Sequence, residues 1–164
     1  MHCVHVLINH YSTARFHSTL KREADGGVGL WGACFDGGQP HEGTGEAPGL
    51  LRAAGLVERL RGEGSLVTDH GDLVGTRGGQ QEVLDFSRLV AARVKEILGK
   101  GQVAVTLGGD HSVGLGTVAG SLQHDPDTVV LWVDAHADIN TLETSTTGNM
   151  HGMPVRMVGW CCWC

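Results

Sequence analysis

The sequence predicts an α/β fold with three layers, in which helices flank a mainly parallel sheet. Short, continuously apolar runs alternate with longer segments whose apolar residues recur every three or four positions. The first pattern is typical of buried strands and the second of amphipathic helices, and their alternation favours parallel strands joined by right-handed crossovers. Glycine makes up 26 of 164 residues without a collagen-like period, which fits tight turns between strands and helices.

The first half of the chain predicts two strand–helix units. Residues 28–34 (VGLWGAC) form an apolar strand that a glycine-rich loop closes. Pro48 can start a helix that runs to Gly62, and residues 65–68 form a second, brief strand. The clearest helix of the chain follows Gly79, because apolar residues line one of its faces. These residues are Val83, Phe86, Val90, Val94 and Ile97.

The second half of the chain continues the same alternation. Residues 103–107 (VAVTL) and 128–133 (TVVLWV) form two further strands, and Ser112 can N-cap a helix between them that runs toward Leu122. Ligands of parallel α/β sheets bind beyond the carboxyl ends of the strands. The residues directly after these two strands are therefore the first to examine for chemistry.

Composition and charge exclude several classes of function. The net charge of −6 leaves no basic stripe to follow a phosphate backbone, so we expect no nucleic-acid partner. No apolar run reaches the roughly 18 residues that a membrane helix needs, so we expect no membrane span. Five cysteines without framework spacing argue against a disulfide scaffold and favour a reducing compartment. A small molecule is the expected partner.

Two short motifs rich in titratable residues follow the third and fourth predicted strands. The first reads Gly-Gly-Asp-His-Ser and contains His111, and the second reads Asp-Ala-His-Ala-Asp, from Asp134 through His136 to Asp138. Residues two apart in an extended segment point the same way, so the second motif predicts a row of two carboxylates around an imidazole. If the strands lie close together, His111 joins that row.

This combination of side chains predicts a metal site. A single histidine or aspartate at a strand end is more often an ordinary loop residue than a ligand. Four such groups in two neighbouring loops would be costly to gather without a cation. Oxygen-rich ligation with imidazole and no thiolate favours manganese(II), with iron(II), cobalt(II) or zinc as alternatives.

The same motifs carry a resemblance to a known family. Residues 107–112 (LGGDHS) and 132–140 (WVDAHADIN) resemble the two upstream metal motifs of arginases, which are ureohydrolases. The similarity continues through residues 147–154 (TGNMHGMP) and covers roughly residues 28–155. Asn140, together with Gly-Asn-Met-His-Gly later in the chain, is similar to arginase rather than to agmatinase.

The resemblance implies a centre of two manganese(II) ions. His111, Asp134 and Asp138 correspond to ligands of the first ion, and His136 with a shared Asp134 to ligands of the second. In the family, a hydroxide between the ions attacks the guanidinium carbon of L-arginine and releases urea and L-ornithine. The resemblance therefore implies an arginase-type hydrolase of linear amidines.

Further positions of the family pattern imply catalytic and substrate-binding roles. His151 matches the histidine that transfers protons in the family, and the resemblance implies a catalytic role for Asp138 as well. Four polar residues match positions that recognise the amino-acid end of the substrate, where hydroxyl and amide groups bind a carboxylate without adding charge. These residues are Asn140, Ser145, Thr147 and Asn149.

The expected domain organisation has three parts. Residues 1–27 form an N-terminal extension whose lack of acidic residues over the first 20 positions resembles a mitochondrial leader, so the location is expected to be mitochondrial or cytoplasmic. Residues 28–155 form an incomplete arginase-like α/β domain. Residues 156–164 form a Trp/Cys-rich tail that departs from the family pattern.

One family feature has no counterpart in this sequence. Arginases carry a later Asp-x-Asp motif that supplies more ligands to the second ion, so we expect impaired activity from a chain without it. An inactive arginase-like fragment that binds full-length subunits is one alternative, and an agmatinase-like ureohydrolase is another. A related one-metal deacetylase is disfavoured, because His111 serves a two-metal site. The resemblance also implies a homotrimer.

Overall fold

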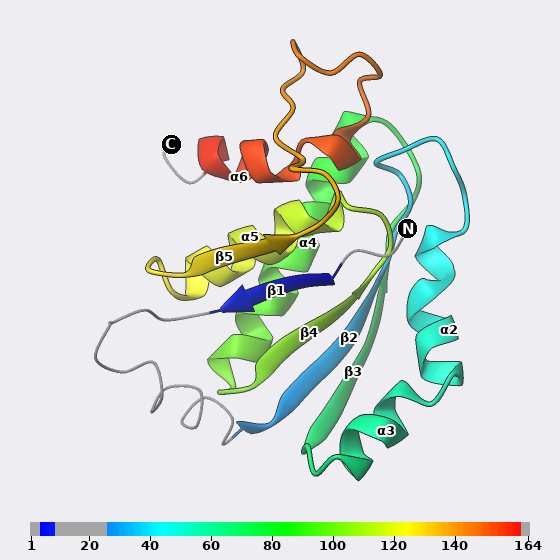
Figure 1. Ribbon diagram of the computed structural model, residues 1–164, viewed down its shortest axis with the longest axis vertical. Coiled ribbons are helices and arrows are strands. Elements are labelled where there is room, and N and C mark those ends of the chain that lie inside the picture. The colour runs from blue at the N-terminus through cyan, green and yellow to red at the C-terminus, as the bar shows by residue number, and fades with distance from the viewer. Residues whose placement is uncertain (1–3, 9–25, 162–164) are drawn as a thin grey trace.

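The computed structural model describes residues 4–8 and 26–161, and strands and helices alternate along them (Figure 1). The strands are β1 (Val4–Ile8), β2 (Val28–Cys34), β3 (Val67–Val74), β4 (Val103–Gly108) and β5 (Val129–Val133). The helices are α2 (Ala47–Ala53), α3 (Leu56–Gly62), α4 (Gln80–Gly99), α5 (Val113–His124) and α6 (Pro154–Cys161). Two 3-10 helices are η2 (Thr44–Glu46) and η3 (Met150–Gly152).

The strands form two hydrogen-bonded groups. β2 lies between β3 and β4 and pairs with both in parallel, which gives the order β3-β2-β4. β5 pairs with β1 in antiparallel orientation, with Val4 opposite Val133. The predicted α/β class with a mainly parallel sheet is confirmed, although β4 and β5 belong to different groups of strands.

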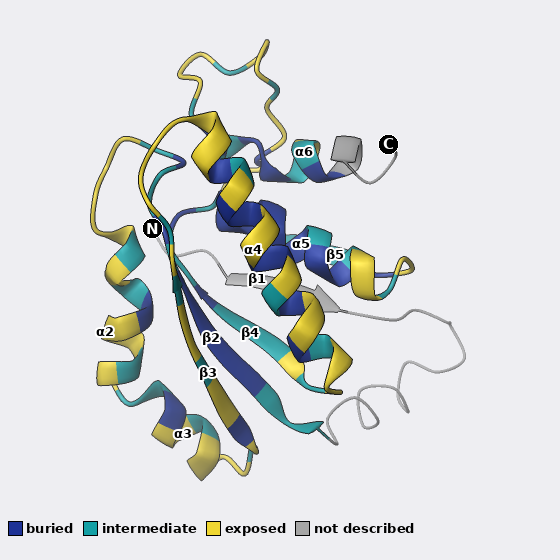
Figure 2. Cartoon of the chain, turned by 180° about the vertical axis from the view of Figure 1, so that it is seen from behind, coloured by how far each residue is buried: buried dark blue, intermediate teal, exposed yellow. Residues whose placement is uncertain are grey.

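Helices cover both faces of the β3-β2-β4 sheet (Figure 2). Trp31 of β2 is fully buried against α4, and the neighbouring Leu30 is fully buried on the opposite face together with Val57 of α3. Alternation along the strand therefore fills two separate cores. The helix predicted after Gly79 is confirmed, because all five residues of its apolar face are buried in α4.

The region before β3 differs from the sequence prediction of one helix. α2 and α3 are separate, with Gly55 between them at φ 84°. The left-handed conformation of Gly55 ends α2, and its N–H donates to the carbonyl of Arg52 at 2.9 Å. The predicted helix start at Pro48 is confirmed, since this proline lies in the first turn of α2.

The second strand is longer than predicted. β3 continues to Val74, well beyond the brief apolar run at 65–68. Its register against β2 shifts between Leu30 and Gly32, which indicates a bulge. β3 is an edge strand of its sheet, so polar residues are tolerated along it and the apolar pattern ends before the strand does.

Two aspartates of β3 hold helix α2 against the sheet. Arg52 Nε lies 2.7 Å from Asp69 Oδ2, and Arg52 Nη1 lies 2.7 Å from Asp72 Oδ1. The hydrogen bond from Arg52 holds the pKa of the Asp69 carboxyl below its usual range. These contacts give the polar edge strand a structural role.

Replacing Arg52 with methionine should lower the free energy of unfolding by about 1–2 kcal/mol near pH 7. Because the folded-state pKa of Asp69 is depressed, its contribution is present above the unfolded value of about 3.9 and is lost as the pH falls through the folded value. Urea unfolding at pH 7 and pH 3 should show the difference between the two proteins shrinking at low pH. An equal loss from Arg59→Met, on the exposed side of α3, would contradict this account.

The two ends of the described chain contain secondary structure outside residues 28–155, the domain range expected from the sequence. Val4–Ile8, within the expected N-terminal extension, forms β1, whereas residues 1–3 and 9–25 lie outside the described residues. α6 continues to Cys161, and its Val158 packs against Leu115 and Val118 of α5. Residues 162–164 of the expected tail also lie outside the described part.

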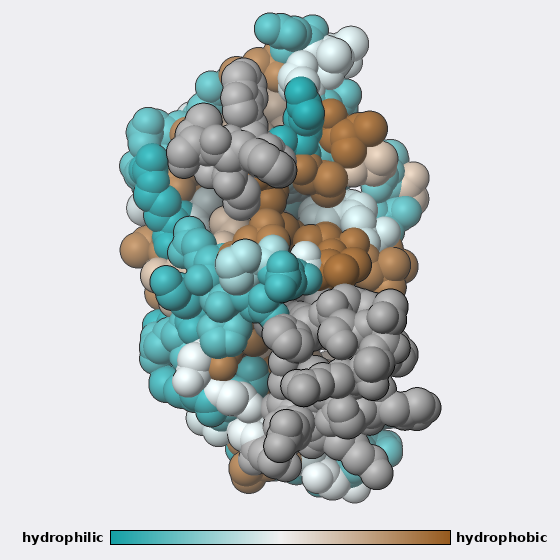
Figure 3. Space-filling model, turned by 90° about the vertical axis from the view of Figure 1, so that its left-hand side faces the viewer, coloured by the Kyte–Doolittle hydropathy of each residue, from teal (hydrophilic) through white to brown (hydrophobic). Residues whose placement is uncertain are grey.

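Part of the surface is apolar. The outer side of β5 leaves Val129, Leu131 and Val133 about half exposed. Figure 3 shows apolar side chains gathered across the middle of one side of the molecule. Within the part of the chain that the structure describes, none of the helices combines the length and apolar character needed to cross a membrane.

Candidate metal centre

The end of β4 fixes the backbone that carries the first candidate ligand. The N–H groups of Gly109 and Asp110 donate to the carbonyls of Ala33 and Phe35 at the end of β2, at 3.1 and 3.0 Å. A Cβ on Gly109 would lie 1.8 Å from the Phe35 carbonyl oxygen, so a larger residue cannot occupy this position without moving the backbone. This close approach places His111 directly beyond the sheet.

Asp110 supports this turn from inside. Its buried carboxylate accepts the N–H of Gly38 at 2.7 Å and the N–H of Ser112 at 2.9 Å, and it also accepts the Ser112 hydroxyl. The predicted helix after Ser112 is confirmed as α5, but no side-chain cap bond to that helix is present. The hydroxyl of Ser112 is turned toward Asp110 instead, which stiffens the segment around His111.

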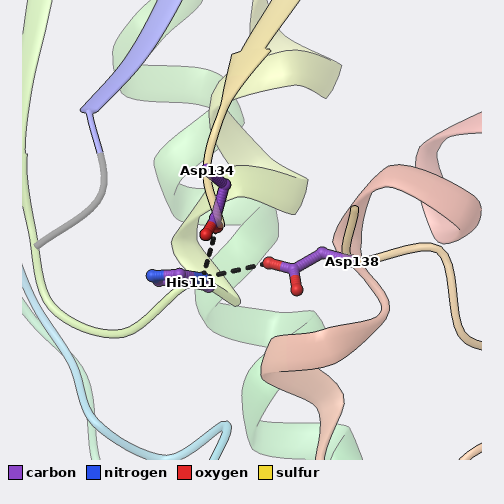
Figure 4. Close-up of side chains that lie close together, drawn as sticks. All are labelled: His111, Asp134 and Asp138. Atoms are coloured by element: carbon purple, nitrogen blue, oxygen red, sulfur yellow. Dashed lines mark hydrogen bonds and ion pairs between the residues drawn. The ribbon is translucent and has the colours of Figure 1, made fainter. Parts of the chain in front are cut away.

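Three candidate ligands from two strand ends meet at one point (Figure 4). His111 Nδ1 lies 3.0 Å from Asp134 Oδ2 and 3.0 Å from Asp138 Oδ2. The side chains of Asp134 and Asp138 are only 3% and 7% exposed, and His111 is 21% exposed. Two nearly buried carboxylates thus face the same imidazole nitrogen, an arrangement that a bound cation would stabilise.

The spacing of these atoms fits a divalent ion. Neighbouring ligands of a six-coordinate ion with bonds of about 2.1 Å lie about 3.0 Å apart. The three ligand atoms lie within 4.8 Å of one another, and each residue offers one of them. One imidazole with two carboxylates suits manganese(II) and related transition metals. The residues present therefore fit the metal that the family resemblance implies.

Asp138 lies at an unusual backbone position. Its φ of 49° falls in the left-handed region, which residues other than glycine adopt infrequently. The carbonyl of Asp138 accepts the N–H of Val155 at the start of α6, at 3.2 Å. The left-handed conformation turns the chain after β5, so the extended row expected from Asp134 to Asp138 is not kept.

His136 lies outside the group of three. Its side chain is 69% exposed, and its Nδ1 lies 3.7 Å from Asp134 Oδ1. The N–H of His136 donates to the same oxygen at 3.1 Å. The two oxygens of Asp134 therefore face two different imidazoles, those of His111 and His136. A carboxylate in this position can contact two ions at once.

His151 lies near the three candidate ligands. Its ring centre is 6.3 Å from that of His111, and its N–H donates to the carbonyl of Gly38 at 3.1 Å. The neighbouring Asn149 lines a pocket of about 370 Å³, together with Gly38 and Arg77. His151 thus lies near one candidate ligand, and it follows a segment that borders a pocket.

The other expected substrate-binding residues lie in the loop between β5 and η3, which projects from the body of the domain (Figure 1). Ser145 Oγ accepts the N–H of Gly148 at 3.0 Å, and Thr147 Oγ1 accepts the N–H of Asn149 at 3.3 Å. Asn140 Oδ1 accepts a hydrogen bond from the Thr144 hydroxyl at 3.4 Å. These groups form hydrogen bonds within the loop itself.

Sequence reasoning missed two residues that support the site. Asp110 and Gly38 are joined by a hydrogen bond across 72 positions of the chain, and no local sequence pattern indicates such a contact. The position of Asp110, directly before His111, could have indicated its supporting role, because a carboxylate at a strand end needs hydrogen-bond donors. The adjacent Gly37 and Gly38 could have indicated the close packing of this loop, since glycines often mark a close approach of two backbones.

Comparison with known proteins relates these features to one family. The chain matches the family described as the arginase family over residues 26–162. It is 40% identical over 150 residues to non-hepatic arginase 2 of Xenopus laevis, covering 85% of this chain and 42% of that protein. It is 41% identical over 141 residues to arginase-1 of Homo sapiens, covering 80% and 44% of the two proteins.

The fold of this chain is also similar to that of a solved arginase structure. The arginase of Bacillus subtilis subsp. subtilis str. 168 superposes with a TM-score of 0.71 at 37% identity. The superposition covers 79% of this chain and 46% of the bacterial arginase. The chain spans a little under half the length of the relatives that it matches.

Proposed function

The chain belongs to the arginase family, and on this basis we propose that it hydrolyses L-arginine to L-ornithine and urea at a centre of two manganese(II) ions. The observation that carries the proposal is the convergence of His111, Asp134 and Asp138. These residues correspond to the positions that the family resemblance assigns to the metal, and their donor atoms have the spacing that such an ion requires.

The candidate ligands divide between the two ions. His111, Asp134 Oδ2 and Asp138 Oδ2 would hold the first ion, and Asp134 Oδ1 with His136 would contribute to the second. Manganese(II) held by these residues would lower the pKa of a water molecule and so supply the nucleophile for the guanidinium carbon. Asp134 keeps the two positions close together, because its two oxygens face the two imidazoles.

His151 would move the proton that this hydrolysis requires. When the bond between the guanidinium carbon and the side-chain nitrogen breaks, the departing amine of L-ornithine must gain a proton. The imidazole of His151 can give it, because histidine is the side chain that most often acts as a general acid in enzymes. The position of its ring near His111 supports this role.

Four polar residues would recognise the amino-acid end of L-arginine. Amide and hydroxyl groups can bind a carboxylate and an amino group without burying further charge. Asn149 borders the pocket, which supports a contact with substrate there. The residues assigned to this role are Asn140, Ser145, Thr147 and Asn149.

Urea release tests this proposal directly. The purified chain, loaded with manganese(II), should release urea from L-arginine and much less from agmatine, and the metal content of the same sample should approach two ions per chain. His111→Ala should lose the urea release and lower the metal content. A fully loaded chain that prefers agmatine would contradict the arginase assignment and support an agmatinase-like enzyme.

A second candidate function is the binding of full-length arginase subunits by a catalytically inactive chain. It is favoured by the ligands of the second ion: the 164 residues hold no counterpart of the later Asp-x-Asp motif, which leaves Asp134 and His136 as the candidates. Size-exclusion chromatography with a full-length arginase distinguishes the two, because a binding chain would co-elute with the larger protein and release no urea alone.

A further inference from the structure

Residues 36–43, between β2 and η2, form a loop that a single arginine holds at three points. We call this segment the clamped loop. Arg77 Nε lies 3.3 Å from Asp36 Oδ1, and Nη1 lies 2.7 Å from Glu42 Oε1. Arg77 Nη2 donates to the carbonyl of Gln39 at 3.0 Å. The planar guanidinium group suits such a set of separate acceptors, and lysine offers no equivalent fork.

The clamped loop needs such a restraint. Three of its eight residues are glycine, which has high conformational freedom in the unclamped state. Asp36 is 17% exposed at its side chain, and its second oxygen accepts the N–H of Gly43 at 3.0 Å, so it joins the two ends of the loop. Glu42 is 81% exposed, and solvent screens its ion pair with Arg77 more strongly. Asp36 and the Gln39 carbonyl are therefore the main attachment points.

Gly38 connects the clamped loop to the candidate metal centre. Its N–H donates to Asp110 Oδ2 at 2.7 Å, beside His111, and its carbonyl accepts the N–H of His151 at 3.1 Å. A Cβ at this position would lie 2.7 Å from the Cβ of Ser112, so the loop is packed tightly against the start of α5. A shift of Gly38 would disturb both neighbours of the centre.

We propose that Arg77 is a positioning residue for the reaction, which it serves by fixing Gly38 and, through it, His151. Arg77 contacts Asp36, Glu42 and the Gln39 carbonyl, and it acts through the clamped loop. It also lines the same pocket as Gly38 and Asn149, so the restraint sets the shape of one pocket wall. The effect of this restraint on catalysis rests on the proposed function, whereas the restraint of the loop by Arg77 does not depend on it.

The test compares Arg77→Gln with Arg88→Gln as a matched control. Arg88 lies on α4 and pairs with Asp85, one turn away on the same helix. Amide hydrogen exchange should be roughly tenfold faster at His151 and Gly38 in Arg77→Gln, with exchange in the α4 core around Val90 unchanged. Arg77→Lys should restore only part of the protection. Unchanged exchange at His151 in Arg77→Gln would overturn the proposal.

A kinetic measurement adds the catalytic readout. If the chain hydrolyses L-arginine, Arg77→Gln should lower kcat by about tenfold and change KM by less than about twofold, because the proton-transfer geometry is lost more than substrate binding. A chain without urea release would contradict the proposed function, and the exchange result would still decide the positioning role. If Arg77→Gln does not fold, the double variant Asp36→Asn with Glu42→Gln removes both ion pairs of Arg77 and keeps its hydrogen bond to the Gln39 carbonyl, so exchange must become faster at the same two amides by a smaller factor.

Discussion

Replacing Asp134 with asparagine should weaken manganese(II) binding by at least about 100-fold. The side chain of Asp134 is 3% exposed, and its two oxygens face His111 and His136. Asparagine keeps the size of the side chain but replaces one oxygen by a nitrogen that donates hydrogen bonds and carries no charge. One proposed ion therefore loses its oxygen ligand, and the other keeps only a neutral amide oxygen in place of a carboxylate. Isothermal titration calorimetry with manganese(II) measures the effect.

A matched control separates the loss of a ligand from the loss of a negative charge. Asp127→Asn removes the same charge from an exposed turn after α5, and it should leave manganese(II) affinity unchanged. Circular dichroism should show that Asp134→Asn remains folded. Equal affinity in the wild-type chain and in Asp134→Asn would mean that the metal binds elsewhere.

Replacing Gly109 with alanine should destabilise the fold by about 3 kcal/mol and also weaken metal binding. The added Cβ would meet the Phe35 carbonyl oxygen at 1.8 Å and the Phe35 nitrogen at 2.9 Å. Both are backbone atoms at the end of β2, so a change of side-chain rotamer cannot relieve the clash. The turn that carries His111 must therefore move away from β2.

The control for this substitution is Gly49→Ala in α2. Nothing lies within 4 Å of a Cβ built at Gly49, and alanine favours helix by about 1 kcal/mol over glycine. Urea unfolding should therefore give a midpoint for Gly49→Ala at or above that of the wild-type chain, and a clearly lower midpoint for Gly109→Ala. Equal midpoints for Gly109→Ala and the wild-type chain would show that β2 and the turn are not packed as described.

The parts of the fold that the sequence predicted are those with strong local periodicity. The strand at 28–34 agrees with β2 at both ends, because five of its seven residues are buried and a continuous apolar run marks such a strand. The long helix α4 was predicted from the spacing of its apolar face. In both elements, local preference and tertiary packing favour the same structure.

The parts that were missed depend on contacts that local patterns do not contain. The break between α2 and α3 rests on one left-handed glycine, Gly55, inside an otherwise helical pattern. β3 extends along a polar edge that Arg52 stabilises from another element. β1 pairs with a strand more than a hundred positions away, and its five residues alone could not indicate that partner.

The residues of the candidate site could be predicted from the sequence, whereas their relative orientation could not. Positions after two strand ends pointed to His111, Asp134 and Asp138, and the structure brings these three together. The orientation of His136 could not be foreseen, because the extended conformation ends with β5 and the backbone turns at Asp138. The clamp at Arg77 rests on contacts across 35 and 38 positions of the chain, which no local pattern reveals.

Anomalous X-ray scattering from manganese-soaked crystals of this chain would test the central claim most directly. A strong manganese peak is expected within bonding distance of His111 Nδ1, Asp134 Oδ2 and Asp138 Oδ2. A second, weaker peak is expected between Asp134 Oδ1 and His136. Manganese peaks confined to exposed acidic side chains elsewhere, with none at these three residues, would contradict the assignment of the metal centre.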